Sequence, residues 1–167
     1  NIYIMIIVKK PGFLKYKDFK YRCALGKAGI KKKNQEGDNI TPIGIFRINK
    51  IYYRADKIKK ILSPIKTIQI KKNMGWCDDP KSNLYNQPIN LPTKFSHEKL
   101  YRNDNIYNLV LVLDYNTNPV IKNKGSAIFI HVAKNPYNKT KGCIALEEKD
   151  LIELISKIKK DTKIKIS

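Results

Sequence analysis

A histidine and a cysteine, His131 and Cys143, lie close together in the segment SAIFIHVAKNPYNKTKGCIAL, residues 126–146, of a chain with two histidines and three cysteines. A cysteine thiolate is a strong nucleophile, and a neighbouring base helps it to form near neutral pH. Gly142 stands directly before Cys143, and backbone N–H groups at this position could stabilise an oxyanion. These residue types suit acyl transfer, with Cys143 as the nucleophile and His131 as its base.

The same residues also have a purely structural interpretation, which their types and spacing leave open. Cysteine is among the most buried residue types, and a single histidine beside an apolar strand is common. If the two side chains point into separate cores, the chemical interpretation fails. The chain has no G-x-S-x-G segment, so a cysteine site is favoured over a serine site.

Short runs rich in Ile, Val and Tyr predict that strands position these residues. Gly, Pro, Asn or Asp bounds most of the runs. One run leads directly to His131, which would place its side chain on a rigid element. The predicted strands cover residues 2–8, 19–25, 44–48, 65–70, 109–115 and 127–132, and KIKIS at 163–167 adds a predicted edge strand.

Two segments predict helices. DKIKKILS at 56–63 ends before Pro64, where a helix is expected to stop. EEKDLIELISKIKK at 147–160 has Ile and Leu at helical spacing, with acidic residues first and lysines last, as the helix dipole favours. Residues 71–108 form a long irregular stretch, which is typical of a binding element. The pattern predicts one mainly β domain over residues 1–167, of α+β or β-sandwich architecture.

The composition is strongly basic, because 34 Lys and Arg residues against 14 Asp and Glu residues give a formal net charge of +20. Such a charge suggests a polyanionic partner: nucleic acid, an anionic membrane surface or an acidic wall polymer. The lysines are spread along the chain, few of the cations are Arg, and no nucleic-acid-binding motif is present. We therefore do not expect a nucleic-acid partner.

The cysteine spacing and the N-terminal segment indicate neither a metal site nor a membrane span. The cysteines are odd in number and widely spaced, unlike a disulfide framework, although one pair could still be bridged. The mixed set Cys77, His97, His131 and Cys143 matches no usual zinc spacing, so we expect no metal. The apolar run 2–8 is too short to span a bilayer, and its lysines follow it, unlike those of a signal peptide.

The long stretch 71–108 offers candidates for substrate contact. Its carboxylates could hold an ammonium group and its aromatic rings could contact a substrate face, although Asp78-Asp79-Pro80 also fits a simple turn. His97 is either a second functional histidine or a local hydrogen-bonding residue. The candidates are Trp76, Asp78, Asp79, Tyr85, Asn86, His97 and Tyr101, with Tyr137 beyond the stretch, and packing roles remain equally open for the last two.

The segment IFIHVAKNPYNKTKGCIAL resembles the active-site signature of the L,D-transpeptidase catalytic domain family, the YkuD-like fold. That family pairs a strand-borne histidine with a downstream Ser/Thr-x-Gly-Cys segment, here Thr140 to Cys143. GDNITPIGIFRI at 37–48 resembles its Thr-Pro-x-Gly segment, and GWCDDPKSNLYNQPINLP, SHEKLYRND and GSAIFIHVA resemble a small-protein branch. Many members have Gly after the histidine and Arg two residues after the cysteine, where this chain has Val132 and Ala145.

The resemblance implies a YkuD-like β-sandwich with a mixed sheet and a few peripheral helices. It implies that Cys143 attacks a carbonyl of a peptidoglycan stem peptide and forms a thioester, with His131 as base and a backbone carbonyl orienting its ring. An amine of a neighbouring stem would complete a crosslink, whereas water would make the enzyme a carboxypeptidase or endopeptidase. Thr140 would contact the substrate, no cofactor would be required, and the location would be the periplasm or cell envelope.

Overall fold

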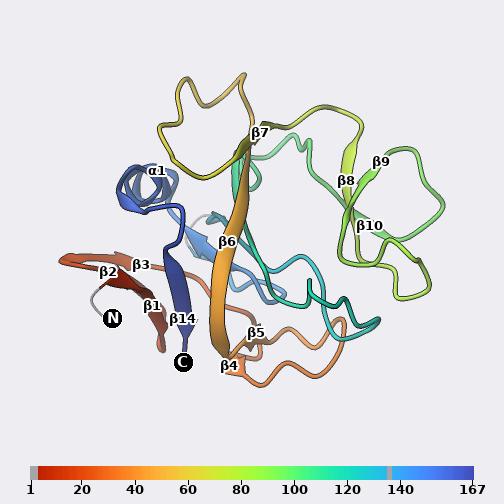
Figure 1. The fold of residues 1–167 in the computed structure, drawn as a ribbon, viewed down its shortest axis with the longest axis horizontal. Helices are drawn as coiled ribbons and strands as arrows, with labels where there is room; N and C mark the ends of the chain where they lie inside the picture. The colour runs from red at the N-terminus through yellow and green to blue at the C-terminus, as the bar shows by residue number, and fades with distance from the viewer. Residues whose placement is uncertain (1–3, 135–136) are drawn as a thin grey trace.

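Strand β6 (Gly44–Tyr53) is the central element of the computed structural model, which describes residues 4–134 and 137–167. Its first half pairs with β14 and its second half with β11, so β6 belongs to both halves of one continuous sheet. The strand order is β13-β12-β11-β6-β14-β1-β2-β3, with β7 parallel to the end of β6. Figure 1 shows β6 crossing the middle of the molecule between these halves.

The first half-sheet joins β6 to four strands from the two ends of the chain. Outward and inward residues alternate along these strands, so one face is buried and the other is in solvent. The sequence KIKI shows the pattern most simply, because Ile164 and Ile166 are buried while Lys163 and Lys165 are exposed. The strands are β1 (Ile6–Lys9), β2 (Phe13–Tyr16), β3 (Phe19–Arg22) and β14 (Lys163–Ile166).

The second half-sheet is covered on both faces. Its strand β11, LVLVL, is buried at every position, as a strand between two layers requires. Leu109, Leu111 and Leu113 contribute to the core shared with the first half-sheet, whereas Val110 and Val112 belong to a second cluster on the opposite face. The strands joining β6 here are β7 (Thr67–Gln69), β11 (Leu109–Leu113), β12 (Phe129–Val132) and β13 (Ile144–Leu146).

A small antiparallel sheet forms the third layer and covers that opposite face. Trp76 and Leu100 from this segment pack against Val110, Val112 and Phe129 of the second half-sheet. The small sheet lies on the far side of the molecule from β1 to β3 (Figure 1). Its strands are β8 (Met74–Cys77), β9 (Pro88–Asn90) and β10 (His97–Lys99), and two short strands, β4 (Ile30–Lys31) and β5 (Thr41–Pro42), pair separately.

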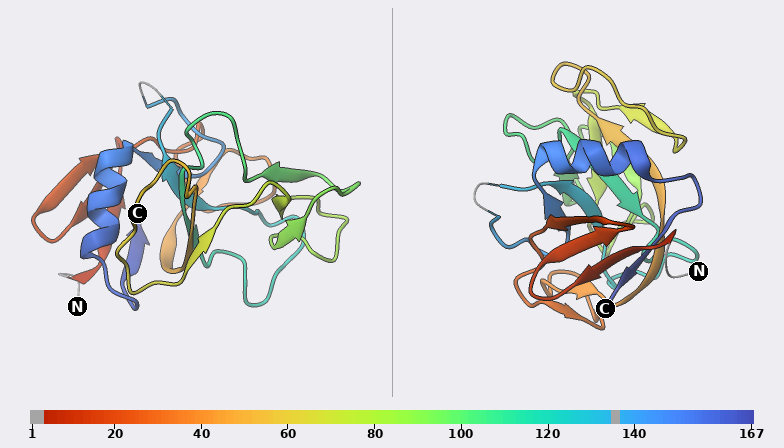
Figure 2. Two further views of the ribbon diagram at one scale, coloured as in Figure 1. Left: turned by 90° about the horizontal axis from the view of Figure 1, so that it is seen from above. Right: turned by 90° about the vertical axis from the view of Figure 1, so that its left-hand side faces the viewer.

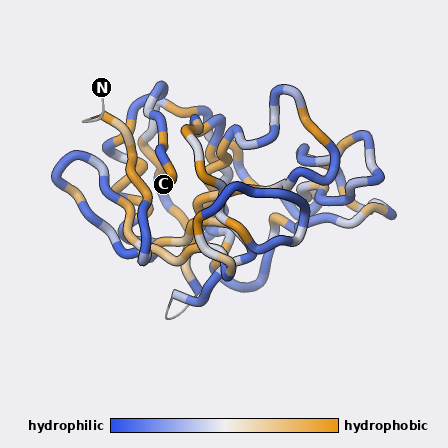
Figure 3. Tube along the Cα trace, turned by 90° about the horizontal axis from the view of Figure 1, so that it is seen from below, coloured by the Kyte–Doolittle hydropathy of each residue, from blue (hydrophilic) through white to orange (hydrophobic). Residues whose placement is uncertain are grey.

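Helix α1 (Glu148–Lys157) closes the side of the sandwich and follows directly after β13. Its buried residues are Leu151, Leu154 and Ile155, which join the main core, and Glu148 and Asp150 lie in its first turn. Figure 2 shows the helix beside the strands of the first half-sheet, and Figure 3 shows hydrophobic segments concentrated in the central strands. The expected mainly β, α+β architecture is thus confirmed.

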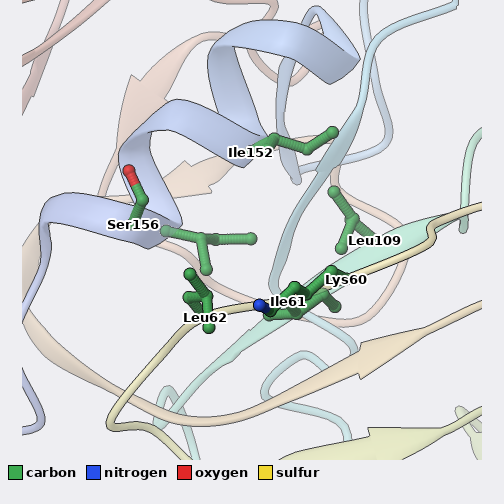
Figure 4. Close-up of a pocket in the computed structure, with 7 residues that line it drawn as sticks. Lys60, Ile61, Leu62, Leu109, Ile152 and Ser156 are labelled. Carbon is green, nitrogen blue, oxygen red and sulfur yellow. The ribbon is translucent and has the colours of Figure 1, made fainter.

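The predicted helix at 56–63 was wrong. The segment makes only one turn, in which the N–H groups of Lys57 and Ile58 donate to Arg54 O, at 3.1 and 2.9 Å. A segment this short gains little from helix formation, and burial of Ile58 in the core holds it as a loop instead. Figure 4 shows Ile61 and Leu62 of this loop across a small apolar pocket from α1.

Two other expectations also needed correction. Strand β14 was expected at an edge, but it lies inside the sheet, parallel to β1 and antiparallel to β6, because its two isoleucines enter the core. The stretch 71–108 was expected to be irregular, but it contains the three strands of the small sheet. Among the predicted strands, residues 2 and 3 lie outside the described residues.

Candidate active site

Strand β12 places His131 on the face of the second half-sheet that the small sheet covers. Phe129 and His131 point to this face, and Ile130 points to the sandwich core. The His131 Nδ1 lies 2.9 Å from Val132 O, and since a carbonyl can only accept, Nδ1 carries the proton. The neutral ring therefore keeps Nε2 as its proton acceptor. The ring of Tyr107 packs edge-on against the imidazole, with centroids 5.5 Å apart.

Cys143 lies directly before β13, which runs parallel to β12. Its thiol donates to Ala127 O at 3.1 Å, and the Phe129 N–H donates to its Sγ at 3.5 Å. The sulfur is therefore held against the backbone of the strand segment that carries His131. Among the described residues the Cys143 N–H has no protein acceptor, so it is free to bind an oxyanion.

The hydroxyl of Thr140 fixes the turn before the cysteine. It accepts from the Gly142 N–H at 3.1 Å and donates to Cys143 O at 2.6 Å. The Gly142 N–H is thus already engaged, which leaves the Cys143 N–H as the better oxyanion donor of the two. Gly142 itself has φ +142°, and a Cβ there would lie 2.8 Å from Ile40 O, so only glycine fits.

The Thr-Pro segment of the sequence supports this turn from behind. Thr41 donates its hydroxyl proton to Gly142 O at 2.9 Å and accepts from the Gly26 N–H at 2.8 Å. Both bonds are buried. Two motifs that are far apart in the sequence are therefore joined by one side chain. Thr41 is a positioning residue, a role that nothing in the sequence indicated beyond its place in the Thr-Pro-x-Gly segment.

His131 and Cys143 line the same pocket, which has a volume of about 410 Å³. Sequence reasoning found five of its lining residues, which are Cys143, His131, Gly142, Thr140 and Asp78. It missed Glu36, Glu98, Arg102, Tyr107 and Ala127, which also line the pocket. The signal for Glu98 and Arg102 was their place in SHEKLYRND, whereas nothing in the sequence marked Tyr107.

The pocket carries both signs of charge. Carboxylates of Glu36, Asp78 and Glu98 line it together with cations, which are Arg102, Lys134, Lys139 and Lys141. Burial, with Asp78 nearby, raises the pKa of Glu98 above its usual value. Arg102 is held by Asp104 through two bonds, at 2.8 and 2.6 Å. A zwitterionic ligand can therefore find partners for both of its charges in this pocket.

Burial favours the neutral forms of both Cys143 and His131. It raises the pKa of the Cys143 thiol to about 12, although the Phe129 N–H opposes this shift. It lowers the pKa of His131 to about 4, against the opposing effect of the bond to Val132 O. At pH 7 the site therefore holds a thiol and a neutral imidazole with Nε2 free to accept a proton, which is the state that a general base requires.

Trp76 and Asn86, two of the predicted contacts, lie behind the pocket instead of lining it. Asn86 is 4% exposed and its Oδ1 accepts from Trp76 Nε1 and from the Ala127 N–H, each at 3.0 Å. Its Nδ2 donates to Tyr115 O and Asn116 O. Asn86 thereby fixes Ala127, whose φ is +53° and whose carbonyl accepts the Cys143 thiol proton.

Tyr85 is also fully buried and acts on the pocket through a carboxylate. Its hydroxyl donates to Glu36 at 2.6 Å and accepts from the Gly125 N–H at 2.9 Å. Ser126 donates to the same oxygen of Glu36. Tyr85 and Ser126 together therefore orient the carboxylate of Glu36, which lines the pocket.

The remaining predicted contacts are dispersed. Asp79 accepts from the N–H groups of Lys81 and Ser96, as its turn interpretation expected. His97 Nδ1 lies 2.8 Å from Phe95 O. Neither Asp79 nor His97 lines the pocket. Tyr101 stacks under Arg54 at 3.6 Å, and Tyr137 packs with Arg22 at 4.4 Å.

Two other pockets of the described residues are lined by neither histidine nor cysteine. The cavity beside α1 is smaller, about 140 Å³, and is lined mainly by aliphatic side chains (Figure 4). All three cysteines are free, and no group of three or more potential metal ligands gathers in residues 4–134 and 137–167. No helix in the same ranges is long and apolar enough to cross a membrane.

Comparison with known proteins identifies the class of protein that this fold and pocket define. The model of the YkuD family, the L,D-transpeptidase catalytic domain, matches residues 3–166. The chain therefore belongs to the L,D-transpeptidase catalytic domain family. A search of the curated proteins found no matching relative.

Proposed function

We propose that this protein is a cysteine-dependent L,D-transpeptidase that uses Cys143 as its nucleophile and His131 as its base. Family membership supports the class of reaction. The observation that carries the residue assignment is that both side chains line one pocket, with the imidazole held in the tautomer that leaves Nε2 unprotonated. The substrate we propose is a peptidoglycan stem peptide.

In the first step the thiol gives up its bond to Ala127 O and transfers its proton to His131 Nε2. Sulfur attacks the stem carbonyl as this proton leaves, because the raised pKa of Cys143 disfavours a free thiolate at rest. The Cys143 N–H stabilises the developing oxyanion. Collapse of the intermediate breaks the amide bond, and His131 gives its proton to the leaving amine, which leaves a thioester.

In the second step an amine of a neighbouring stem attacks the thioester carbonyl, and His131 accepts its proton. The new amide forms as the carbon–sulfur bond breaks, and His131 returns the proton to the Cys143 sulfur, which restores the thiol. We propose that Asp78 and Glu98 hold an ammonium group of the substrate, and that Arg102 and Lys141 hold a carboxylate. These roles rest on the two signs of charge in the pocket lining. Arg102 supplies a cation in a site where Ala145 takes the place of the arginine that many members carry, and Thr140 contributes to the wall.

Asn86, Tyr85 and Trp76 are assigned as positioning residues, because their buried side chains act on the pocket through Ala127 and Glu36. We place the enzyme in the cell envelope, where a peptidoglycan substrate is found. Asp79, His97, Tyr101 and Tyr137 lie outside the pocket lining, so only a substrate longer than the pocket would reach them.

The proposal is tested by intact mass after incubation with a carbapenem, an acylating probe of the reactive thiol. We expect one adduct per chain, which Cys143→Ala abolishes and which Cys23→Ala, a control at a buried cysteine, retains. His131→Gln should slow adduct formation by a factor of about 10² to 10⁴, as is typical when a general base is removed. An adduct that persists in Cys143→Ala would contradict the assignment.

Product masses from muropeptides separate transfer from hydrolysis. Crosslinked dimers support the proposed acceptor amine, whereas trimmed monomers indicate that water is the acceptor and that the enzyme is an L,D-carboxypeptidase or endopeptidase. Neither product, together with no adduct, would overturn the function.

A further inference from the structure

The outer face of the first half-sheet is occupied by cations that are scattered in the sequence. Successive side chains along each of the five strands point to opposite faces of the sheet, so every second side chain points into solvent. In Figure 2, right, strands β1, β2 and β3 face the viewer. The basic face consists of seven exposed side chains: Lys9, Lys15, Lys20, Arg22, Arg47, Lys163 and Lys165.

The strand register brings these like charges together. Arg47 lies directly opposite Lys163, and Lys15 lies directly opposite Lys20. Like charges in directly opposite positions destabilise a sheet. No outward position of these strands carries a carboxylate in the described chain, and no ion pair there involves the basic face. This arrangement weakens the fold, so an anionic partner would relieve it.

Three apolar side chains lie between the cations on the same face. Ile45 is 55% exposed and lies opposite Lys165, while Ile7 and Phe13 are half-buried. Lys20 Nζ lies 4.3 Å above the Phe13 ring. That amine covers the ring, so it is not an open platform on which a nucleic-acid base could stack.

We propose that the basic face binds the surface of a membrane that carries anionic lipids. A layer of strands suits a planar layer of charge, and lysine, which dominates the face, acts as a hydrated point charge that needs no directional partner. Ile45 is placed to reach the apolar boundary of the headgroups. Base readout typically relies on arginine forks, and only two of the seven cations of the basic face are Arg.

This orientation has a consequence for the pocket. The inner residues of the first half-sheet meet the core face of the second, and His131 lies on the other face of that second half-sheet. A chain bound through the basic face therefore turns its pocket away from the lipid. The inference does not depend on the chemistry of Cys143, so Cys143→Ala should bind vesicles as the unchanged chain does.

The test is co-sedimentation with phosphatidylcholine vesicles that contain or lack phosphatidylglycerol. We expect binding only to the anionic vesicles, and a loss of roughly fivefold for each lysine removed from the face, or about a hundredfold for a triple Lys→Gln variant. The face variant carries the changes at Lys9, Lys15 and Lys20. The control carries the same change at Lys59, Lys71 and Lys94, which are exposed outside the face.

Several outcomes would overturn the proposal. One is that the chain does not bind anionic vesicles, and another is that the two triple variants lose the same amount of binding. A third is that single-stranded DNA displaces the chain from vesicles at a lower phosphate concentration than competing anionic lipid does. The thermal midpoint of each variant checks folding, and we expect the face variant to be at least as stable as the control because it loses the like-charge pair of Lys15 and Lys20. A second variant, Ile45→Gln, should weaken binding without changing net charge.

Discussion

Asn86 holds the backbone behind Cys143, and its replacement should have a large effect on stability. Replacing it by Ala removes four hydrogen bonds and leaves the Trp76 and Ala127 N–H groups without their acceptor. A buried group that loses its partner costs about 1–3 kcal/mol, and these costs overlap within one network. The left-handed backbone at Asn86, with φ +58°, adds about 1 kcal/mol when Ala replaces Asn.

We therefore expect Asn86→Ala to lower the free energy of unfolding by about 4 kcal/mol, a large part of the 5–15 kcal/mol of an ordinary domain. The assay is urea unfolding followed by fluorescence of Trp76, the single tryptophan, whose indole N–H is one of the affected groups. The thiol of Cys143 should also change its rate of acylation, because Ala127 O is its hydrogen-bond acceptor.

Asn123 provides the matched control. Its backbone is also left-handed, with φ +66°, and its exposed side chain makes no hydrogen bond to another described residue. Asn123→Ala should therefore show the backbone effect alone, about 1 kcal/mol, and leave acylation unchanged. If the two variants differ by less than about 1 kcal/mol, the role assigned to the Asn86 network is refuted.

Three further changes give separate tests. Gly142→Ala places a Cβ 2.8 Å from Ile40 O, so we expect a loss of about 1–3 kcal/mol in urea unfolding and a slower acylation in the carbapenem assay. Thr41→Val removes the bonds to Gly26 and Gly142 and should cost about 2–4 kcal/mol by thermal unfolding, whereas Thr41→Ser should stay within about 1 kcal/mol; equal losses would exclude the hydroxyl as the cause. Burial lowers the pKa of His131 from its usual 6.5 to about 4 in the folded chain. The contribution of the neutral imidazole to the free energy of unfolding is therefore complete above pH 6.5 and is lost as pH falls towards 4. Over that window the unchanged chain should lose about 3 kcal/mol more than His131→Gln, and parallel pH curves would contradict this.

The sequence contained enough information to predict that His131 and Cys143 lie at one site, and to predict much of the sandwich. The run before His131 is apolar enough to predict a strand by itself, and the Thr-x-Gly-Cys segment identifies Cys143 as the cysteine that follows it. The same alternation that predicted a strand at 163–167 also determines which side of β14 is buried. These features depend on local pattern, which a single sequence displays directly.

Trp76, Tyr85 and Asn86 were predicted as substrate contacts, but their supporting role could not be predicted in this way, because their partners come from distant segments. Asn86 is linked to Trp76, Ala127 and Tyr115, and no local pattern marks an asparagine that will accept bonds from two layers. The strands of the small sheet were missed because they have only three or four residues and include polar ones such as His97. At that length tertiary contacts decide the conformation.

The lysines illustrate the same limit in a different form. Along the chain they are dispersed, so no basic run marks a binding segment. The pairing of β2 with β3 and of β14 with β6 places Lys15 beside Lys20 and Lys163 beside Arg47. Charge that is diffuse in one dimension therefore becomes concentrated on one sheet face once the register is set.

The internal position of β14 has a consequence for synthesis of the protein. Residues 163–166 fill the gap between β1 and β6, so the sheet of this domain remains open on the ribosome until those residues have emerged from the exit tunnel. Until then β1 and β6 each present an unpaired edge, which is a template for association with other nascent chains. A message that terminates before Ile164 would thus yield a chain that contains both His131 and Cys143 but has no closed sandwich to hold them.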